Sequence, residues 1–281
     1  MRVAVTGASG FIGRHVITEL RRRSVDVTAV LRDDVNRAEQ PVGESSDRSI
    51  FIDIFRPPQD AFARMGSPDA LIHLAWGGIN DCNATRHVEQ ELPAQYLFLK
   101  GLIESGLRNI VVAGTCYEYG LQSGGLGEDY PTAPITSYGI AKDSLRRRLL
   151  SLRERRPFNL AWARLFYMYG PGQPENSLLS QLAAAVQRGE RAFKMSEGNQ
   201  LRDYLPVQEV ARNLVELALA GRHWGVVNVC SGEPISVRRL VESHIKENNW
   251  DIGLDLGRFP YRDYEPMEFW GIRGKIDSLK P

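Results

Sequence analysis

Residues 3–20 read VAVTGASGFIGRHVITEL, and this stretch decides the fold that the chain is expected to adopt. The apolar run from Val3 to Thr6 predicts a short strand, and the residues after it have helical periodicity, with apolar side chains at Phe11, Ile12, Val16, Ile17 and Leu20. Glycines in a strand-to-helix turn let the backbone turn tightly and let a pyrophosphate approach the free N–H groups of the helix start. An ordinary strand-to-helix turn is the alternative. The arrangement favours dinucleotide binding, with the cofactor held at Gly7, Gly10, Phe11, Ile12 and Gly13.

Further strands and helices alternate along the rest of the chain. Apolar runs predict strands at 25–31, 49–55, 70–78, 109–115, 160–169 and 224–232, and helical periodicity predicts helices at 89–106, 137–153, 178–188 and 201–221. This alternation is typical of a doubly wound parallel sheet with helices on both faces, a Rossmann-type α/β fold whose ligands bind at the carboxyl ends of the strands. We expect residues 1–169 plus 204–228 to form this dinucleotide-binding domain, and residues 170–203 plus 229–281 to form a small C-terminal lobe that closes over a substrate.

The residue that follows the second strand selects between two dinucleotides. The strand ends at Leu31, and Arg32, Asp33 and Asp34 come next. At this point an acidic residue accepts a hydrogen bond from the ribose 2′-OH of NAD, whereas an arginine suits the 2′-phosphate of NADP. Because Arg32 follows the last apolar residue directly, we expect NADP(H). NAD(H) is the alternative, with Arg32 as a solvated loop residue and Asp33 on the ribose.

The next two strands also end in residues that are expected to line the site. Asp53, which is followed by Ile54, either hydrogen-bonds the adenine amino group or caps its own loop. Leu74 and Ala75 end the fourth strand and are expected to lie over the cofactor. Trp76 follows them and is expected to contact the substrate.

A strand end and a helix start contribute the candidate catalytic residues. Thr115 ends an apolar strand, and Tyr138 and Lys142 stand four residues apart in SYGIAK. On a helix this spacing puts both side chains on one face, one turn apart. A nearby Lys⁺ favours the phenolate, so the pKa of Tyr138 is expected to fall below its usual value of about 10. The Thr115 hydroxyl would hold the substrate oxygen that gains or loses the proton. A tyrosine and a lysine at this spacing are usually no more than surface neighbours. Here, however, the residues at the other strand ends are expected to lie close to Tyr138 and Lys142.

Composition argues against several other classes of protein. The chain has 281 residues and a formal net charge of +1, which gives no argument for nucleic acid or a membrane surface as a partner. Cys82, Cys116 and Cys230 are widely spaced, which argues against a disulfide framework and a metal site and suits a reducing compartment. The first residues already read as a strand and turn, so we expect a cytoplasmic protein without a signal peptide.

Seven motifs resemble the extended short-chain dehydrogenase/reductase family, specifically its nucleotide-sugar branch: TGASGFIG, HLA, GTCYEYG, YGIAK, RLFYMYGPGQ, RDYLPVQEVA and NVCSGEPISV. They occur in family order over nearly the whole chain. The resemblance implies that Thr115, Tyr138 and Lys142 are the catalytic triad, with Tyr138 as the acid/base and Lys142 on the nicotinamide ribose. It also implies that Arg202 binds the diphosphate of a sugar nucleotide, joined by Arg262 from the tail, and that family members often form homodimers through two helices per subunit.

Some residues depart from the family pattern. In the 4,6-dehydratases, the motif threonine is followed by Asp and Glu, whereas this chain has Cys116 and Tyr117, so dehydration is not expected and Glu118 should face elsewhere. In the bifunctional epimerase/reductases of the GDP-fucose pathway, a Cys two residues after the catalytic hydroxyl and a His after YGP perform the epimerisations. Here the Cys is displaced by one residue and Gly172 occupies the His position.

Two further departures concern the sugar pocket and the choice of reaction. Tyr167 and Glu91 stand where the family has Asn, so the sugar pocket is expected to be unusual. Tyr117 and Tyr167 are both expected to contact the substrate. Because Arg32 suits NADP, we expect NADPH-dependent reduction of the 4-keto group of an NDP-4-keto-6-deoxyhexose. The alternatives are an NAD-dependent 4-epimerase of the UDP-hexose type and a non-catalytic dinucleotide-binding regulator. The homodimer is expected to involve the helices near 89–105 and 137–153.

Overall fold

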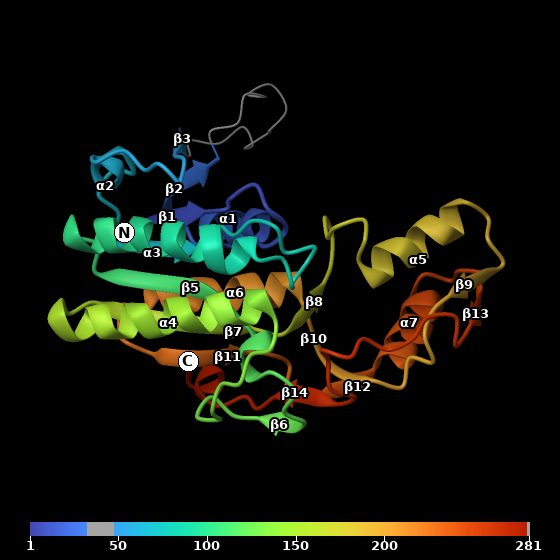
Figure 1. Ribbon diagram of the computed structural model, residues 1–281. Coiled ribbons are helices and arrows are strands. Elements are labelled where there is room, and N and C mark those ends of the chain that lie inside the picture. Colours follow the sequence, from blue (N-terminus) through green and yellow to red (C-terminus); the bar gives the residue numbers. More distant parts are fainter. Residues whose placement is uncertain (33–47, 280–281) are drawn as a thin grey trace.

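A parallel sheet is the largest element of the computed structural model, which describes residues 1–32 and 48–279 (Figure 1). Within these residues the sheet has seven strands in the order β11-β7-β5-β4-β1-β2-β3, each parallel to its neighbours. The strands are β1 (Arg2–Thr6), β2 (Asp26–Leu31), β3 (Arg48–Phe51), β4 (Ala70–His73), β5 (Asn109–Thr115), β7 (Asn159–Leu165) and β11 (Gly225–Val229). The order runs outward in both directions from the β1–β4 pair, so the predicted doubly wound α/β fold is confirmed.

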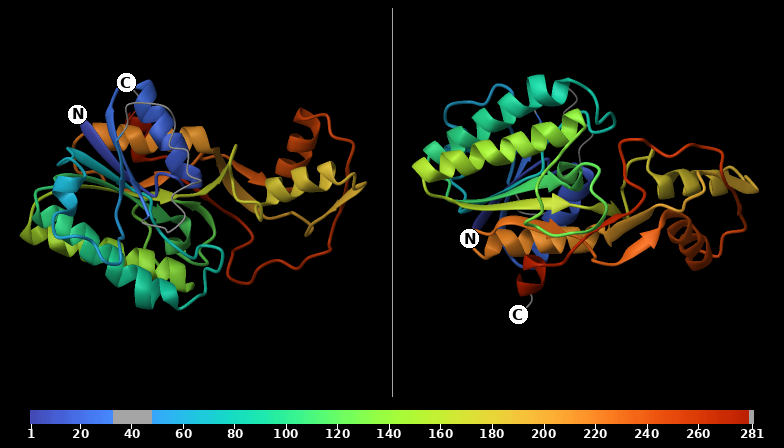
Figure 2. Two further views of the ribbon diagram at one scale, coloured as in Figure 1. Left: turned by 90° about the horizontal axis from the view of Figure 1, so that it is seen from above. Right: turned by 60° about the horizontal axis from the view of Figure 1, so that its bottom comes forward.

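Helices cover both faces of this sheet (Figures 1 and 2). One face carries α1 (Phe11–Arg22) and α6 (Val207–Leu219), and the other carries α3 (Leu92–Glu104), α4 (Ser137–Arg155) and the short α2 (Ala61–Arg64). Successive strand residues point to opposite faces. Val3 and Val5 of β1 therefore pack in the core with α1 and α6, whereas Ala4 packs in the core with α3 and α4. Burial on both faces explains why the central strands β1, β4 and β5 are mainly apolar.

The carboxyl ends of the strands carry the loops that form the site. β1 runs through the glycine turn into α1. After β4, a turn of π-helix, η1 (His87–Glu91), leads directly into α3. After β5 comes a 3-10 turn, η2 (Cys116–Tyr119), whose N-cap is Thr115. These loops therefore meet at one edge of the sheet.

A smaller part of the chain extends away from the main sheet (Figure 2). It has its own hydrophobic core, formed by α5 (Leu178–Gln187), α7 (Val237–Glu247), β9 (Ala192–Lys194) and β13 (Gly253–Asp255). A three-stranded sheet joins it to the main body through β8 (Tyr167–Tyr169), β10 (Leu201–Pro206) and β12 (Pro234–Ser236).

The end of the chain returns to the main sheet. β14 (Phe269–Gly271) pairs with β6 (Gly124–Leu126), and Ile276 of η3 (Lys275–Leu279) packs into the core with α1 and α6. The division into a dinucleotide-binding domain and a substrate lobe stays a prediction. The packing puts residues 269–279 beside the larger part.

Two predictions of elements were wrong in detail, and one helix was not predicted. Residues 160–169 form two strands rather than one, because the chain bends at Phe166, whose N–H donates to the Val229 carbonyl (3.2 Å), and β8 then pairs with β10. Residues 201–206, expected at the start of a helix, form β10 because they pair with β8 and β12 on either side. The sequence reasoning missed α7.

In the part of the chain that the structure describes, none of the helices combines the length and the apolar character needed to span a bilayer.

Candidate active site

The glycine turn after β1 has no room for side chains. Gly7 has a φ of +68°, and a Cβ there would lie 2.9 Å from the backbone N of Ala75. A Cβ on Gly13 would clash with two carbonyl oxygens and lie 2.7 Å from that of Ala8. α1 begins after Gly10, which provides no side-chain cap, so the first N–H groups of the helix are left for an anion. Side chains at these positions would fill the cradle. Because glycines leave the space and the N–H groups free, the cradle fits the pyrophosphate of a dinucleotide.

A cavity of about 640 Å³ runs along the same edge of the sheet. Its lining includes ten of the predicted cofactor residues: Gly7, Gly10, Phe11, Ile12, Gly13, Arg32, Asp53, Ile54, Leu74 and Ala75. Asp53 lies just beyond β3, where its Oδ1 accepts a hydrogen bond from the N–H of Phe55 (2.9 Å), so it caps its loop and lines the cavity at once. Arg32 follows β2 and is exposed, while Asp33 and Asp34 lie outside the described residues.

Thr115, Tyr138 and Lys142 lie together beside this cavity without lining it. Thr115 ends β5, and the other two residues stand one turn apart near the start of α4. The Lys142 Nζ lies 5.7 Å from the centroid of the Tyr138 ring. It donates a hydrogen bond to the carbonyl of Ala113 (2.8 Å) and lies 4.0 Å from the centroid of the Trp76 ring. The predicted constellation is thus brought together by β5 and α4.

Burial dominates the protonation of this pair. It raises the pKa of Tyr138 above the usual value, the negative charge of Glu118 acts in the same direction, and a side-chain hydrogen bond to Thr115 opposes both. Burial also lowers the pKa of Lys142 from 10.5 to about 7, against the pull of two buried carboxylates. The expected fall in the tyrosine pKa is therefore wrong for this structure. The lysine is itself desolvated, and its ammonium group is turned toward a carbonyl and an indole ring.

Trp76 and Tyr117 flank the tyrosine on two sides. Trp76 lines the cofactor cavity, donates from Nε1 to His87 Nδ1 (3.0 Å) and meets the Tyr138 ring edge-on, with centroids 6.0 Å apart. The Tyr117 ring also meets Tyr138 edge-on, at 6.4 Å, and its hydroxyl donates to Glu265 Oε1 (3.0 Å). Tyr138 therefore lies between the cofactor cavity and the residues of a second cavity.

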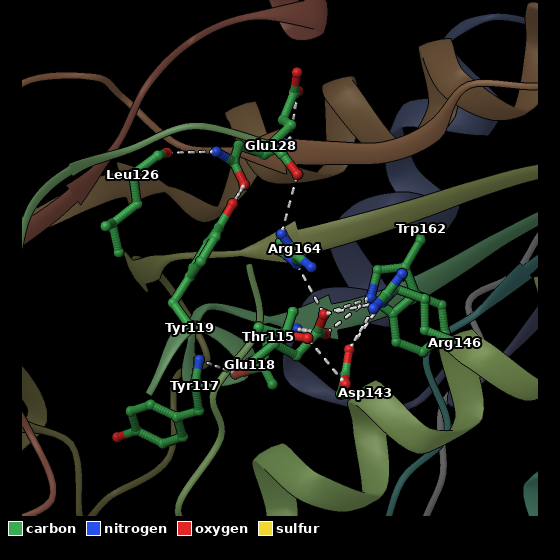
Figure 3. Close-up of polar contacts among 12 residues, drawn as sticks. Thr115, Tyr117, Glu118, Tyr119, Leu126, Glu128, Asp143, Arg146, Trp162 and Arg164 are labelled. Atoms are coloured by element: carbon green, nitrogen blue, oxygen red, sulfur yellow. Dashed lines mark hydrogen bonds and ion pairs between the residues drawn. The ribbon is translucent and has the colours of Figure 1, made fainter. Parts of the chain in front are cut away.

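Glu118 points away from the site, as the sequence predicted. Figure 3 shows its carboxylate turned toward Trp162 and Arg164, while the Tyr117 ring points in another direction. The carboxylate accepts hydrogen bonds from the N–H of Thr115 (2.9 Å), Trp162 Nε1 (2.8 Å) and Arg164 Nε (2.8 Å). It is fully buried, so it holds the loop in place and is not available to a substrate.

The second cavity, of about 420 Å³, is lined by Tyr167, Arg202 and Arg262, three of the predicted substrate residues. Arg202 is buried and donates from NH2 to Glu265 Oε2 (3.1 Å), and Arg262 NH1 lies 3.4 Å from Glu265 Oε1. Of the other predicted substrate residues, Trp76 lines the cofactor cavity. Thr115 and Tyr117 line neither cavity.

Glu265 is one of the residues of this cavity that the sequence did not predict. Its carboxylate joins Tyr117, Arg202 and Arg262, which come from three separate parts of the chain. The surrounding RDYEP has no period that would place it in a helix or strand. The only feature of the sequence that could have indicated Glu265 is its position three residues after Arg262.

The cradle, the cavity along the strand ends and the Tyr138–Lys142 pair define a class: a Rossmann-type α/β protein with a cavity that fits a dinucleotide beside a tyrosine and a lysine. Residues 3–230 match the family model described as the NAD dependent epimerase/dehydratase family, and the chain belongs to that family. The predicted membership of the extended short-chain dehydrogenase/reductases that act on nucleotide sugars is thereby confirmed.

Two curated relatives and one solved structure are similar over most of their length. The dTDP-6-deoxy-L-talose 4-dehydrogenase (NAD(+)) of Aggregatibacter actinomycetemcomitans is 32% identical over 277 residues, covering 97% of this chain and 100% of that protein. The dTDP-6-deoxy-L-talose 4-dehydrogenase (NAD(P)(+)) of Kitasatospora kifunensis is 29% identical over 265 residues, covering 88% of this chain and 79% of that protein. The structure of MoeE5 in complex with UDP-glucose and NAD has 28% identity and a TM-score of 0.80, covering 99% of this chain and 91% of that one.

Proposed function

We propose that this protein is an NAD(P)-dependent oxidoreductase that interconverts a hydroxyl and a keto group at C4 of a nucleoside-diphosphate 6-deoxyhexose. The observation that carries the proposal is the 32% identity to a dTDP-6-deoxy-L-talose 4-dehydrogenase over essentially the full length of both chains. A catalyst accelerates a reaction in both directions, so a 4-dehydrogenase is also a 4-ketoreductase. We favour the reductive direction, with NADPH and an NDP-4-keto-6-deoxyhexose as substrates.

The residues beside the cofactor cavity can handle the proton of such a reaction. When bound, a nicotinamide dinucleotide would supply the hydride to C4 of the sugar or accept it from there. In reduction, the Tyr138 hydroxyl donates a proton to the sugar oxygen, and the Thr115 hydroxyl holds that oxygen. The high pKa of Tyr138 keeps it protonated before the reaction, as a donor must be. Lys142, with a pKa of about 7, is the adjacent group able to return a proton near neutral pH.

Two related reactions fit the site less well. A 4,6-dehydratase needs an acid and a base after Thr115, and burial raises the pKa of both Cys116 and Tyr117, which stand there. Glu118, the nearest carboxylate in sequence, is engaged by Trp162 and Arg164. The same buried state of Cys116 argues against epimerisation through a cysteine thiolate.

The preference for NADP(H) over NAD(H) rests on Arg32. It lines the cofactor cavity directly after β2, where a guanidinium suits a 2′-phosphate. One curated relative is described with NAD(+) and the other with NAD(P)(+), so both cofactors belong in the assay.

Substrate recognition is proposed for the second cavity and the residues that connect it to Tyr138. Arg202 and Arg262 would bind the diphosphate of the nucleotide sugar. Trp76, Tyr117 and Tyr167 would shape the space for the hexose. The smaller part of the chain would act as the substrate lobe. A homodimer through α3 and α4 stays a prediction.

An NAD-dependent 4-epimerase is the second candidate, because the family that the chain belongs to includes NAD-dependent epimerases by its description. Such an enzyme keeps its dinucleotide bound and shows no net oxidation. A non-catalytic dinucleotide-binding protein is a weaker candidate, since the tyrosine and the lysine are both present and adjacent.

The test follows nicotinamide absorbance with purified protein. NADP⁺ or NAD⁺ is mixed with dTDP-6-deoxy-L-talose, and NADPH or NADH with a set of NDP-4-keto-6-deoxyhexoses. Stoichiometric formation or consumption of the reduced cofactor is expected, faster with the phosphorylated form. No net change with any of these sugars, together with NAD⁺ released on denaturation and C4 exchange in UDP-hexoses, would replace the proposal with the epimerase.

Tyr138→Phe should lower turnover by roughly 10²–10⁴-fold, because it removes the proton donor and leaves the ring packing. Its dinucleotide Kd should stay within about threefold of wild type, because Tyr138 lies outside the cofactor cavity. Tyr130→Phe, at an exposed tyrosine, is the matched control and should retain activity. Near-wild-type turnover of the Tyr138 variant would refute the assignment of the proton donor.

A further inference from the structure

Arg86 is a second arginine in the wall of the cofactor cavity, and the function proposed above gives it no role. The cavity is lined on one side by the glycine turn and on another by the segment after β4, which contributes Arg86, Glu91 and Gln95. The Arg86 side chain is 45% exposed, so part of it is accessible to a ligand. A guanidinium on the wall of a dinucleotide cavity is a natural partner for phosphate oxygens.

A series of hydrogen bonds between buried polar side chains holds Arg86 in position. Arg86 NH2 donates to Glu91 Oε1 (3.0 Å), and the Glu91 side chain is 1% exposed. Glu91 Oε2 accepts a hydrogen bond from Gln95 Nε2 (2.9 Å), and Gln95 Oε1 lies 2.8 Å from His73 Nε2. His73 Nδ1 in turn lies 2.8 Å from the Thr6 hydroxyl. These hydrogen bonds anchor the guanidinium to β1, which leads into the cradle, and to the neighbouring strand β4.

Two adjacent glycines make the room that Arg86 occupies. A Cβ on Gly77 would lie 2.5 Å from Glu91 Oε1 and 3.1 Å from Arg86 NH2. A Cβ on Gly78 would lie 2.9 Å from Arg86 Cδ. Another residue at Gly77 would displace the pair, and another residue at Gly78 would displace Arg86. Gly77 and Gly78 therefore leave the space that Arg86 and the Glu91 carboxylate occupy after β4.

Arg86 keeps N–H donors that Glu91 does not use, and these can bind an anion. Its guanidinium carries five N–H donors, and among the described residues its one hydrogen-bonded partner is Glu91. Glu91 neutralises the arginine when the cavity holds no ligand and fixes one edge of the fork. The remaining donors can meet phosphate oxygens without a change in the buried pair.

Strand order separates Arg86 from the other cavity arginine. Arg32 follows β2 and Arg86 follows β4, and these strands lie on opposite sides of β1. The glycine cradle at the end of β1 therefore lies between them. A 2′-phosphate near Arg32 and a diphosphate at the cradle would thus meet different cations.

We propose that Arg86 binds the diphosphate of the dinucleotide opposite the glycine turn, and that Glu91 is a positioning residue that aims the guanidinium. The inference rests on the proposed use of this cavity for NAD(P). It assigns to a pair outside the recognised motifs the task of clamping the cofactor.

The test measures the dissociation constants of NADPH and NADH by the fluorescence of the reduced nicotinamide, without sugar substrate. Arg86→Gln alone leaves the buried Glu91 carboxylate without its counter-charge. The decisive variant is therefore Arg86→Gln/Glu91→Gln, in which neither charge remains. Its thermal midpoint by circular dichroism should match that of the Glu91→Gln single variant, which keeps the arginine. Arg32→Gln is the matched control at the other cavity arginine.

The double variant is expected to raise the Kd of NADPH and of NADH alike, by about tenfold, because both cofactors carry the same diphosphate. Arg32→Gln should raise the Kd of NADPH alone. A double variant that is folded and binds both cofactors as wild type does would overturn the inference and leave the proposed function standing. Loss of NADPH affinity alone would also overturn it, because Arg86 would then read the 2′-phosphate. Wild-type protein that binds neither dinucleotide would refute the proposed function itself.

Discussion

Replacing Glu118 by glutamine should destabilise the protein strongly although the side chain keeps its shape. Each carboxylate oxygen accepts at least two hydrogen bonds: Oε1 from the N–H of Thr115 (2.9 Å) and from Trp162 Nε1 (2.8 Å), and Oε2 from Arg164 Nε (2.8 Å) and Trp162 Nε1 (3.0 Å). Whichever way the amide is oriented, its NH₂ group meets a donor. The change also removes the counter-charge of a guanidinium that is 1% exposed.

The expected loss is about 3–5 kcal/mol, the usual cost of breaking a buried ion pair from one side. With a urea m-value of about 3 kcal/mol/M for a chain of this size, the unfolding midpoint should fall by about 1–1.7 M. Equilibrium unfolding followed by circular dichroism measures the shift. The double variant Glu118→Gln/Arg164→Met, which no longer buries an unpaired charge, should recover at least half of it. A single variant within about 0.3 M of wild type, or a double variant that is less stable still, would contradict the reasoning.

Two further predictions concern the cradle and the buried lysine. Gly13→Ala should abolish measurable NADPH binding, because its Cβ would meet the backbone of Gly7 and Ala8. The control Gly101→Ala has open space around it and should bind NADPH as wild type does. Equal affinities of the two variants in fluorescence titration would count against the cradle. Lys142 has a pKa of about 7 in the folded protein and 10.5 in the unfolded chain. Between these pH values only the unfolded state holds the proton, so the free energy of unfolding rises with pH across that window. The free energy of unfolding of wild type relative to Lys142→Met should therefore rise by about 1.4 kcal/mol per pH unit from pH 8 to 9, with a smaller slope near pH 7. A difference in urea midpoints that does not change with pH would show that the lysine is not desolvated.

The glycine turn and the strand-end residues could be predicted because they follow local rules. A strand, glycines and a helix in succession determine the backbone of the cradle, and β1, Gly10 and α1 appear where the pattern put them. Four-residue spacing likewise put Tyr138 and Lys142 on one face of α4. The pKa of Tyr138 was beyond such rules, since it depends on burial and on which way the lysine ammonium turns.

Other features depend on pairings between distant segments. The break at Phe166 is set by Val229, on a strand that follows much later in the chain. The strand at residues 201–206 carries an ordinary mixture of polar and apolar residues and is a strand because β8 and β12 flank it. Hydrophobic periodicity records which face of an element is buried, but not which element covers it.

The sequence by itself determined the doubly wound sheet, the dinucleotide cradle and the tyrosine–lysine pair, because backbone sterics and helical spacing act within a few residues. Only the tertiary structure decided that Glu265 would join Arg202 to Tyr117, across sequence separations of 63 and 148 residues, and that Arg86 would rest on Glu91 beside the cradle. A charged side chain chooses its partner by proximity and desolvation in the folded chain, and no spacing in the sequence encodes that proximity.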